Sequence, residues 1–379
     1  MNVLIYSNSS IGGCYEYAKQ IANAFSINDQ VNNCYALFPK DCGKECQHSV
    51  DILMKDKLFK GFFKLWGKLY FILRSIVNPI RAFKFALKNN IDFFIFNDFD
   101  QVSAFFWTHK FKSRNFKTAI ILHDPDRTAY FKIKSLSECS MQKIMNIVDF
   151  AFYHEQLPNL SYYKNVDNRI IFNKIPHGIY PADNIDNEFS NFLKQIKNTS
   201  KIVSITGNIR AEKNYKIAIE AISKLENYTL LIAGNIVSNS ENIDDYKNFA
   251  KQKGVENKVV FINKYLSNAE LSSIFSESDI ILLYYSKSFK SQSGILNSLS
   301  PFKPNLIVSN IESGMTFTVK KFQLGIIAEP DNTQSLIDAI KNFPQNNPFK
   351  DNWNKFAEYS SWKRNVDIQI STFKTTKND

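Results

Sequence analysis

A turn rich in positive charge follows a short apolar run in the second half of the chain, where Gly207 precedes Arg210 and Lys213. The run before it, Ile202–Thr206, predicts a strand, and the residues after it have the spacing of a helix. Glycine lets a ligand approach the backbone, the helix start offers unpaired N–H groups, and the two side chains supply full charges. The turn therefore predicts a phosphate or diphosphate site, although a solvated turn with two surface cations would use the same residues.

Two further turns have the same strand-to-helix setting. Gly12 and Gly13 follow the run Val3–Tyr6, and their backbone amides can come close to an anion or a sugar. No third glycine follows at the spacing of the dinucleotide fingerprint. Ser293 and Gly294 open a helix after another apolar run and predict a second anion site at a helix N-terminus. Tight structural turns and ordinary capping are the alternatives for both segments.

The elements that must position these turns are short apolar runs, each followed by a helical pattern, as in parallel β–α units. Such runs suit strands buried on both faces of a sheet. The first series of expected strands is Val3–Tyr6, Tyr35–Phe38, Phe93–Phe96, Thr118–Leu122, Phe150–Tyr153 and Ile170–Ile175. The second series is Ile202–Thr206, Thr229–Ala233, Val259–Ile262, Ile280–Leu283, Asn305–Val308 and Gly325–Ala328. The 379 residues therefore predict two doubly wound, Rossmann-like parallel α/β sheets.

A polar stretch, 181–200, separates the two series and is the expected domain boundary. We expect an N-terminal domain over 1–180, a second domain over 201–345, and a C-terminal helix over 346–379 that crosses back to the first domain. Ligands of open α/β sheets bind at the carboxyl ends of the strands. The site is therefore expected in a cleft where the two sheets face one another.

The composition is that of a globular protein with a basic balance. Its 47 Lys and Arg against 36 Asp and Glu give a formal charge of +11, which favours a nucleic acid, an acidic membrane or a phosphorylated substrate as partner. Five unevenly spaced cysteines argue against a disulfide framework and indicate a reducing compartment. Cys34, Cys42, Cys46 and His48 form only a weak metal pattern, and no metal is expected. The first residues lack the charged region of a signal peptide, and no apolar run is long enough to span a membrane, so a cytoplasmic location is expected.

Taken in chain order, these turns resemble the family 4 glycosyltransferases, whose GT-B fold consists of two Rossmann-like domains. The resemblance covers nearly the whole chain. Its motifs are Gly12-Gly13, Leu122-His-Asp-Pro125, Ile175-Pro-His-Gly178, Gly207-Asn-Ile-Arg210 with Lys213, Leu230-Leu-Ile-Ala-Gly234, Glu277-Ser-Asp-Ile-Ile281, Gln292-Ser-Gly-Ile-Leu296 and Lys303-Pro304.

The resemblance implies a retaining, metal-independent glycosyltransferase without a cofactor, whose donor is a nucleotide-diphosphate sugar. Arg210 and Lys213 would neutralise the diphosphate beside Gly207, while Gly12 or Gly13 would close on the donor from the first domain. Ser293 and Gly294 would add helix N–H groups.

The resemblance also assigns His123, at the end of a first-domain strand, to a hydroxyl of the donor sugar. A structural histidine is the alternative of equal weight. Asp124 would assist it, and Arg127 is a weaker candidate for a phosphate contact.

Departures from the family pattern lie at the ribose end of the donor. Two family glutamates, eight positions apart, correspond to the neighbourhoods of Phe289 and Asn297, which hold no carboxylate. Asn297 would then bind ribose as a weaker, neutral partner. The family's glycine before Lys303-Pro304 is Phe302 here. Two alternatives stay open: a catalytically silent homologue that serves as membrane-associated partner subunit of an active transferase, and a sugar-nucleotide epimerase of the same architecture.

A basic amphipathic stretch occupies residues 54–88. Its bases, against the single acid Asp56, are Lys55, Lys57, Lys60, Lys64, Lys68, Arg74, Arg81, Lys84 and Lys88. Opposite the lysine face at helical spacing lie Leu58, Phe62, Leu65, Trp66, Leu69 and Leu73. Such helices lie in membrane interfaces, which predicts contact with an anionic membrane surface; the alternative is a helix whose apolar face joins the core. Nucleic acid is not expected, because the aromatic residues do not interleave with the lysines.

Together these features predict a transferase acting on a saccharide or lipid-linked saccharide acceptor in polysaccharide or surface-glycan biosynthesis. Its expected place is the cytoplasm, peripheral to the inner face of the membrane.

Overall fold

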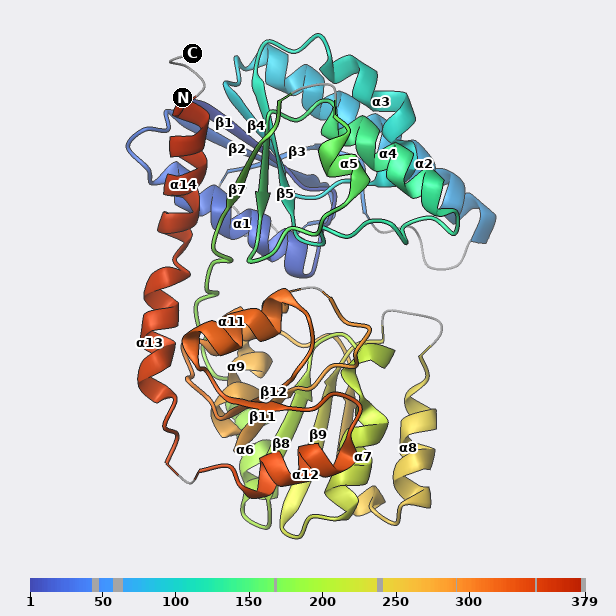
Figure 1. Ribbon diagram of the computed structural model, residues 1–379, viewed down its shortest axis with the longest axis vertical. Coiled ribbons are helices and arrows are strands. Elements are labelled where there is room, and N and C mark those ends of the chain that lie inside the picture. Colours follow the sequence, from blue (N-terminus) through green and yellow to red (C-terminus); the bar gives the residue numbers. More distant parts are fainter. Residues whose placement is uncertain are drawn as a thin grey trace. The chain divides into compact units, whose positions relative to one another are not determined.

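The computed structural model describes residues 1–42, 48–56, 64–166, 169–236, 241–290, 292–344 and 346–375. Contacts divide the chain into two compact units, Met1–Gly178 with Ser360–Asp379, and Ile179–Tyr359. Each unit holds a parallel sheet with helices on both faces (Figure 1). Among the described helices, none is long and apolar enough to cross a membrane.

The sheet of the first unit has the order β3-β2-β1-β4-β5-β6-β7, and all of its pairings are parallel. Its strands are β1 (Asn2–Tyr6), β2 (Asn33–Pro39), β3 (Ser49–Leu53), β4 (Phe93–Phe96), β5 (Lys117–Leu122), β6 (Phe150–Tyr153) and β7 (Ile171–Lys174). The strand order reverses between β1 and β4, so the chain leaves these two neighbours in opposite directions. In open α/β sheets this switch point is where ligands bind.

Helices cover both faces of this sheet. They are α1 (Gly13–Ser26), α2 (Lys64–Lys88), α3 (Ala104–Phe111), α4 (Lys134–Met145), α5 (Ser161–Lys164) and α14 (Trp362–Thr375). The side chains of α1 and α14 form one apolar core with one face of the strands, and those of α2, α3 and α4 form a second core with the other face. In Figure 1 the latter three lie side by side in contact.

The sheet of the second unit has the order β10-β9-β8-β11-β12-β13, again parallel throughout. Its strands are β8 (Lys201–Thr206), β9 (Tyr228–Gly234), β10 (Val259–Asn263), β11 (Ile280–Leu283), β12 (Leu306–Ser309) and β13 (Ile326–Ala328). Its helices are α6 (Asn187–Lys197), α7 (Tyr215–Ser223), α8 (Ile243–Gln252), α9 (Asn268–Glu277), α10 (Gly294–Leu299), α11 (Gly314–Phe322), α12 (Thr333–Lys341) and α13 (Lys350–Tyr359).

The strands expected from the sequence are all confirmed, and β3 is the one that the apolar pattern missed. Its residues are partly exposed and alternate between apolar and polar, as suits the edge of a sheet. The units divide differently from the expected domains. The stretch 181–200 contains α6, which packs on α9 inside the second unit, and the expected terminal helix is two helices assigned to different units.

Within the first unit, α14 is fixed against the segment that follows β7. The Nδ2 of Asn365 donates to the Tyr17 hydroxyl at 2.8 Å and to the Pro176 carbonyl at 2.7 Å. A Cβ on Gly178 would lie 2.1 Å from the ring of Trp362, so only glycine leaves room for this indole. The terminal helix is thus part of the first unit's core.

Gly178→Ala tests this packing. The added methyl must displace the Trp362 ring, and overpacking of this kind costs about 1–3 kcal/mol of unfolding free energy. Urea unfolding should therefore show a lowered midpoint. Gly294→Ala is the matched control, because nothing lies within 4 Å of its Cβ. Equal midpoints for Gly178→Ala and the wild type would contradict the packing of α14.

Candidate functional site

The basic turn of the second unit runs from the end of β8 to the start of α7. Gly207 has φ +85°, a conformation that favours glycine, and its N–H donates to the carbonyl of Ala233 at 3.0 Å. Arg210 is extended and exposed, and a short 3-10 turn over Ala211–Lys213 leads into α7. The expected strand, turn and helix are confirmed, and the turn lies at the carboxyl end of its strand.

A second glycine permits this turn to pass close to β9. A Cβ on Gly234 would lie 2.1 Å from the carbonyl oxygen of Gly207, a distance that no side chain tolerates. A Cβ on Gly207 would in turn lie 3.3 Å from the Nζ of Lys213. A side chain at Gly234 would therefore collide with the backbone of the turn, and one at Gly207 would crowd the amine of Lys213.

Lys213 is buried, with 7% of its surface exposed, and its Nζ donates to the carbonyl of Thr206. Burial, and next the positive charge of Arg210, lower the pKa of Lys213 to about 7, while Glu212 acts in the opposite direction. No ion pair to Lys213 is found among the described residues. A buried cation without a counter-charge is costly, so an anion placed beside it would be strongly favoured.

The first turn of α10 lies next to this basic turn, because a Cβ on Gly207 would also lie 3.3 Å from the side chain of Ile295. Ser293 is the N-cap and Gly294 the first residue of the helix, as expected, but no side-chain cap forms and the helix has only 6 residues. Its dipole is correspondingly small, so the anion site predicted there from the helix end alone is weak.

Asn297, on the same short helix, is 1% exposed, and neither atom of its side-chain amide has a hydrogen-bond partner in the structure. Buried amides are nearly always satisfied by protein, water or ligand. This amide therefore has both a donor and an acceptor to offer. Eight residues earlier, Phe289 stacks on Tyr285 with ring centroids 4.0 Å apart, so an aromatic pair stands where the family resemblance has its first carboxylate.

In the first unit, Gly12 and Gly13 lie where the sequence placed them, at the start of α1. Gly12 has φ +82°, which explains the glycine, and Gly13 opens the helix. A Cβ on either residue would meet nothing within 4 Å, so neither glycine is required by packing. The space around this helix start is open within its unit.

Three carboxylates hold the loop before these glycines, residues 7–10. Asp98 accepts hydrogen bonds from the hydroxyls of Ser7 and Ser9 at 3.2 and 2.5 Å. Asp100 and Asp56 accept from other polar groups of the loop. Burial raises the pKa of Asp98, and it raises the pKa of Asp100 to about 6. The loop is thus fixed by acids that follow β4 or precede α2. The sequence analysis did not name Asp98 or Asp100, and it noted Asp56 only as the single acid of the basic stretch.

Arg74 of α2 completes this network and corrects one part of the amphipathic interpretation. It was counted with the basic stretch, yet it is 6% exposed and points inward. Its Nη1 pairs with Asp56 and donates to the carbonyl of Asn8 at 3.3 Å, and its Nη2 lies 3.6 Å from Asp100. Neighbouring carboxylates attract its charge into the protein, so it serves the loop and not the surface.

His123 lies at the carboxyl end of β5, as expected, and is half-buried. Its Nε2 is 3.1 Å from the Oδ1 of Asn97, the residue after β4. Burial lowers the pKa of His123 well below its ordinary value, helped by His154, His177 and Arg127, while hydrogen bonding to Asn97 opposes the shift. The imidazole is therefore neutral at physiological pH and cannot act there as a cation.

Tyr17 joins His123 to two further histidines. Its ring centroid lies 4.5 Å from that of His123, 5.5 Å from His154 and 5.0 Å from His177. Burial lowers the pKa of His154 to about 4 and that of His177 to about 3, so both are neutral as well. Apart from the motif containing His177, the sequence analysis missed this cluster. A usable signal existed, since His154 and Asn97 each directly follow an apolar run.

Two weaker candidates lie beside His123. Asp124 is exposed, and its carbonyl accepts a hydrogen bond from the Nε of Arg127 at 3.1 Å. Arg127 lies over the ring of Phe99, 5.4 Å from its centroid. Both thus remain at the same edge of the sheet as the histidine.

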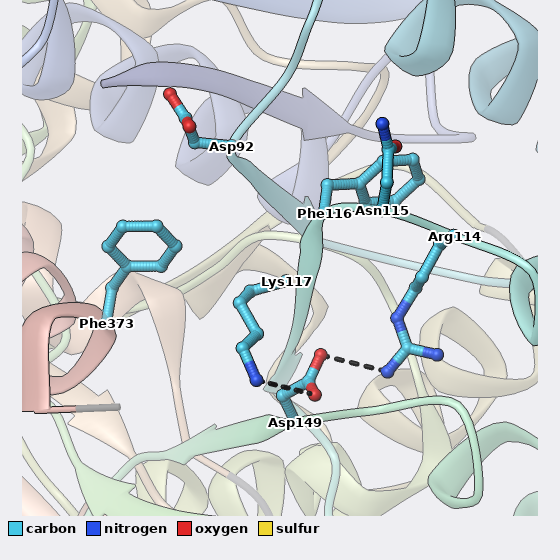
Figure 2. Close-up of a pocket in the computed structure, with 7 residues that line it drawn as sticks. All are labelled: Asp92, Arg114, Asn115, Phe116, Lys117, Asp149 and Phe373. Carbon is cyan, nitrogen blue, oxygen red and sulfur yellow. Dashed lines mark hydrogen bonds and ion pairs between the residues drawn. The ribbon is translucent and has the colours of Figure 1, made fainter. Parts of the chain in front are cut away.

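A hollow of about 360 Å³ at the opposite, amino-terminal edge of the first sheet is shown in Figure 2. Asp149 there pairs with Arg114 at 2.9 Å and with Lys117 at 3.6 Å, and it accepts the N–H of Thr118 at 2.8 Å. Its charges are satisfied internally, and none of the expected site residues lines it. The hollow therefore does not compete with the carboxyl edges as a ligand site.

The structure thus gathers the candidates at two places, each at the carboxyl edge of its own sheet. Gly207, Lys213 and the start of α10 are contiguous in the second unit. In the first unit, Asn97 links His123 to the α1 start, because its Nδ2 donates to the Cys14 carbonyl at 2.9 Å. Among the described residues no group of three or more His, Cys, Asp or Glu could hold a metal ion; Cys46 lies outside them.

Comparison with known families gives one match. Residues 186–359 match the family model of the glycosyl transferases group 1, which covers most of the second unit and its basic turn. The resemblance seen in the sequence is confirmed at the level of this group. None of the curated proteins matches the sequence.

Solved structures share the whole fold. Sucrose-phosphate synthase from Thermosynechococcus elongatus matches 100% of both chains with a TM-score of 0.76 and 12% identity. A glycosyltransferase from Rickettsia africae covers 99% of this chain and 98% of its own, with a TM-score of 0.70 and 14% identity. Anabaena HepE in complex with UDP-glucose covers 98% and 100%, with a TM-score of 0.71 and 12% identity. The predicted GT-B architecture of two Rossmann-like domains is confirmed.

The lowered pKa of Lys213 predicts a pH dependence of anion binding. A bound diphosphate favours the charged amine, so above the unbound value of about 7 each binding event must take up a proton. The affinity for UDP-glucose, whose diphosphate does not titrate in this range, should fall roughly tenfold per pH unit from pH 7 to 9. Calorimetric titration with UDP-glucose at several pH values measures this change in affinity. Lys213→Met should bind weakly with no such slope; the same slope in that variant would refute the assignment.

Proposed function

We propose that this chain, a glycosyltransferase with a group 1 domain in its second unit, transfers a sugar from a nucleotide-diphosphate sugar to a saccharide or lipid-linked saccharide acceptor. The observation that carries the proposal is the turn between β8 and α7, where buried Lys213 and exposed Arg210 stand close to a glycine with positive φ. The described structure offers Lys213 no counter-charge, and a diphosphate supplies one.

Glycosyl transfer builds negative charge on the departing diphosphate. Cations fixed before the reaction stabilise that charge more in the transition state than in the ground state. Lys213 is fixed by its contact with Thr206, and Arg210 lies next to the 3-10 turn that follows. With two cations on the leaving group, we propose a reaction that needs no metal, and a family-like retaining outcome.

The rest of the donor would be bound by groups that flank the turn. The unpartnered amide of Asn297 can both donate to and accept from ribose hydroxyls, and Ser293 lies at the start of the same short helix. UDP-glucose is bound by the structurally similar Anabaena protein, which makes UDP-sugars the first donors to test. In the first unit, we assign His123 to a sugar hydroxyl and the Gly12-Gly13 helix start to the donor or the acceptor.

Turnover with a panel of nucleotide sugars tests the function, and two variants test the site. Arg210→Ala and Lys213→Ala should each lower kcat/KM by about 10²–10³, the usual cost of losing one donor to a developing oxyanion. Lys224→Ala, an exposed lysine at the far end of α7, should leave kcat/KM unchanged. Unfolding midpoints confirm that the variants are folded.

The proposal would be contradicted if the protein neither binds nor turns over any nucleotide sugar. Copurification with an active transferase, unaffected by Arg210→Ala, would then favour the alternative of a silent partner subunit. The replacement of two family carboxylates by Phe289 and Asn297 is the observation behind that alternative.

We further propose that the first unit docks on an anionic membrane, where a lipid-linked acceptor for surface-glycan assembly would lie. The C-terminal half of α2 packs in the core, but its first turns expose Trp66, Leu69 and Leu73 by 63%, 50% and 52%. These belong to the apolar face predicted from the sequence. Lys57, Lys60, Leu58 and Phe62 lie outside the described residues, as do the side chains of Lys64 and Leu65.

Further exposed apolar side chains lie on α3, which contacts α2, and on α4, which contacts α3. The side chains concerned are Phe105 and Phe106 of α3, and Ile133 and Leu136 at the start of α4. Exposed lysines accompany them, namely Lys68, Lys110, Lys132 and Lys134. Exposed rings with neighbouring cations match the interface of a bilayer that contains acidic lipids.

Sedimentation with vesicles tests the docking. The protein should bind vesicles containing phosphatidylglycerol and bind pure phosphatidylcholine far more weakly, because each lysine gains energy only near anionic lipid. The triple variant Trp66→Ser, Leu69→Ser, Leu73→Ser should lower the partition coefficient roughly tenfold or more. Ile27→Ser, at an apolar side chain that is 83% exposed beyond α1, is the matched control. Equal binding to both vesicle types would rule the proposal out.

A further inference from the structure

Asn97 occupies a position between three neighbouring parts of the first unit. It is the residue directly after β4, it is fully buried, and β4 lies between β1 and β5 in the sheet. Its side chain reaches the first turn of α1, which follows β1, and the imidazole of His123, which follows β5. Neither the proposed function nor the family resemblance gives this amide a role.

The orientation of the amide follows from its partners. The Nδ2 donates to the backbone carbonyl of Cys14 at 2.9 Å, and a carbonyl can only accept. Turning the amide over would set two carbonyl oxygens against each other. The Oδ1 of Asn97 therefore faces the Nε2 of His123, 3.1 Å away, and since Oδ1 can only accept, Nε2 must carry the proton.

The remaining ring nitrogen of His123 is then an acceptor. The imidazole is neutral, because burial, His154, His177 and Arg127 all oppose its charge. Burial keeps His154 and His177 neutral as well, and the hydrogen bonds from their Nδ1 atoms to the carbonyls of Ile175 and Gly178 give these two rings the opposite tautomer. In the described structure no residue donates to the Nδ1 of His123.

We infer that Asn97 is a positioning residue that holds His123 as the neutral Nε2–H tautomer, so that Nδ1 accepts a hydrogen bond from a substrate hydroxyl. The inference rests on the proposed function for the identity of that hydroxyl, which a sugar supplies. The same amide holds the Cys14 carbonyl, so the helix start at Gly13 and the imidazole are oriented together. Without Asn97 the ring would populate both tautomers, and in the Nδ1–H form the hydroxyl would have to accept a hydrogen bond instead of donating one.

Nitrogen-15 NMR of the histidine side chains in the full chain, without ligand, tests the tautomer directly. His123→Gln identifies the resonances. In the wild type, Nε2 of His123 should be protonated and Nδ1 not, whereas Asn97→Leu should show a mixture of tautomers. A protonated Nδ1 in the wild type, or an unchanged tautomer in a folded Asn97→Leu protein, would overturn the inference.

Asn97→Asp gives a second readout with little change in shape. A carboxylate beside Nε2 favours the imidazolium, so the midpoint of the His123 titration should move to higher pH. The pH profile of kcat/KM should gain a limb at the same pH, with kcat/KM recovering as His123 loses its proton. Asn89→Asp, which adds the same charge at the end of α2, should change neither profile. An unmoved His123 titration in Asn97→Asp would count against the contact.

Substrate analogues separate this inference from the proposed function. In the wild type, the donor whose sugar lacks the recognised hydroxyl should have a lower kcat/KM than the full donor. The difference should be much smaller in Asn97→Leu, where Nδ1 is no longer held as an acceptor. If no deoxy analogue shows such a difference, the assigned role of Nδ1 is overturned. If the wild type turns over no nucleotide sugar while the NMR result holds, the proposed function fails and the tautomer assignment stands.

Discussion

The basic turn of the second unit keeps a lysine amine inside the protein, and no described residue forms an ion pair with it. Lys213 contacts the carbonyl at the end of its own strand, and glycines at 207 and 234 provide the space in which backbone and amine approach one another. Burial and Arg210 both make its charge costly. An anion would relieve that cost, which is why we propose a diphosphate site here and not only a structural turn. The proposed site lies at the carboxyl end of β8, where parallel α/β folds commonly bind ligands.

The first unit applies the opposite electrostatic arrangement at its own carboxyl edge. Its loop before Gly12 is held by carboxylates and one inward arginine, and the neighbouring strand ends carry neutral histidines around Tyr17. Neutral rings and carbonyl-bound amides suit hydroxyl recognition, whereas fixed cations suit phosphate. The carboxylates that hold this loop also explain why Arg74 of α2 points inward.

Apolar runs were enough to predict the central strands, because a strand that is buried on both faces is a nearly continuous apolar run in the sequence. The basic turn was predictable because glycine, arginine and lysine lie within seven residues of sequence. The sequence analysis named His123 and the motif containing His177, but it did not predict that they form a cluster with His154, since the three come from the ends of separate strands and meet only in the folded sheet. Arg74 was misassigned to the surface for a related reason. Helical spacing predicts which residues share one side of a helix, but the acids that draw this residue inward lie elsewhere in the sequence. The lowered pKa of Lys213 likewise could not be predicted, because it results mainly from burial in the folded protein.

The central claim is that the turn after β8 binds the diphosphate of a nucleotide sugar. A crystal structure of the protein with UDP-glucose tests it most directly. We predict that diphosphate oxygens lie within hydrogen-bonding distance of the Nζ of Lys213 and of the Arg210 guanidinium, with the Gly207 backbone against the phosphates. A diphosphate bound elsewhere, with Lys213 still in contact only with the Thr206 carbonyl, would contradict the account.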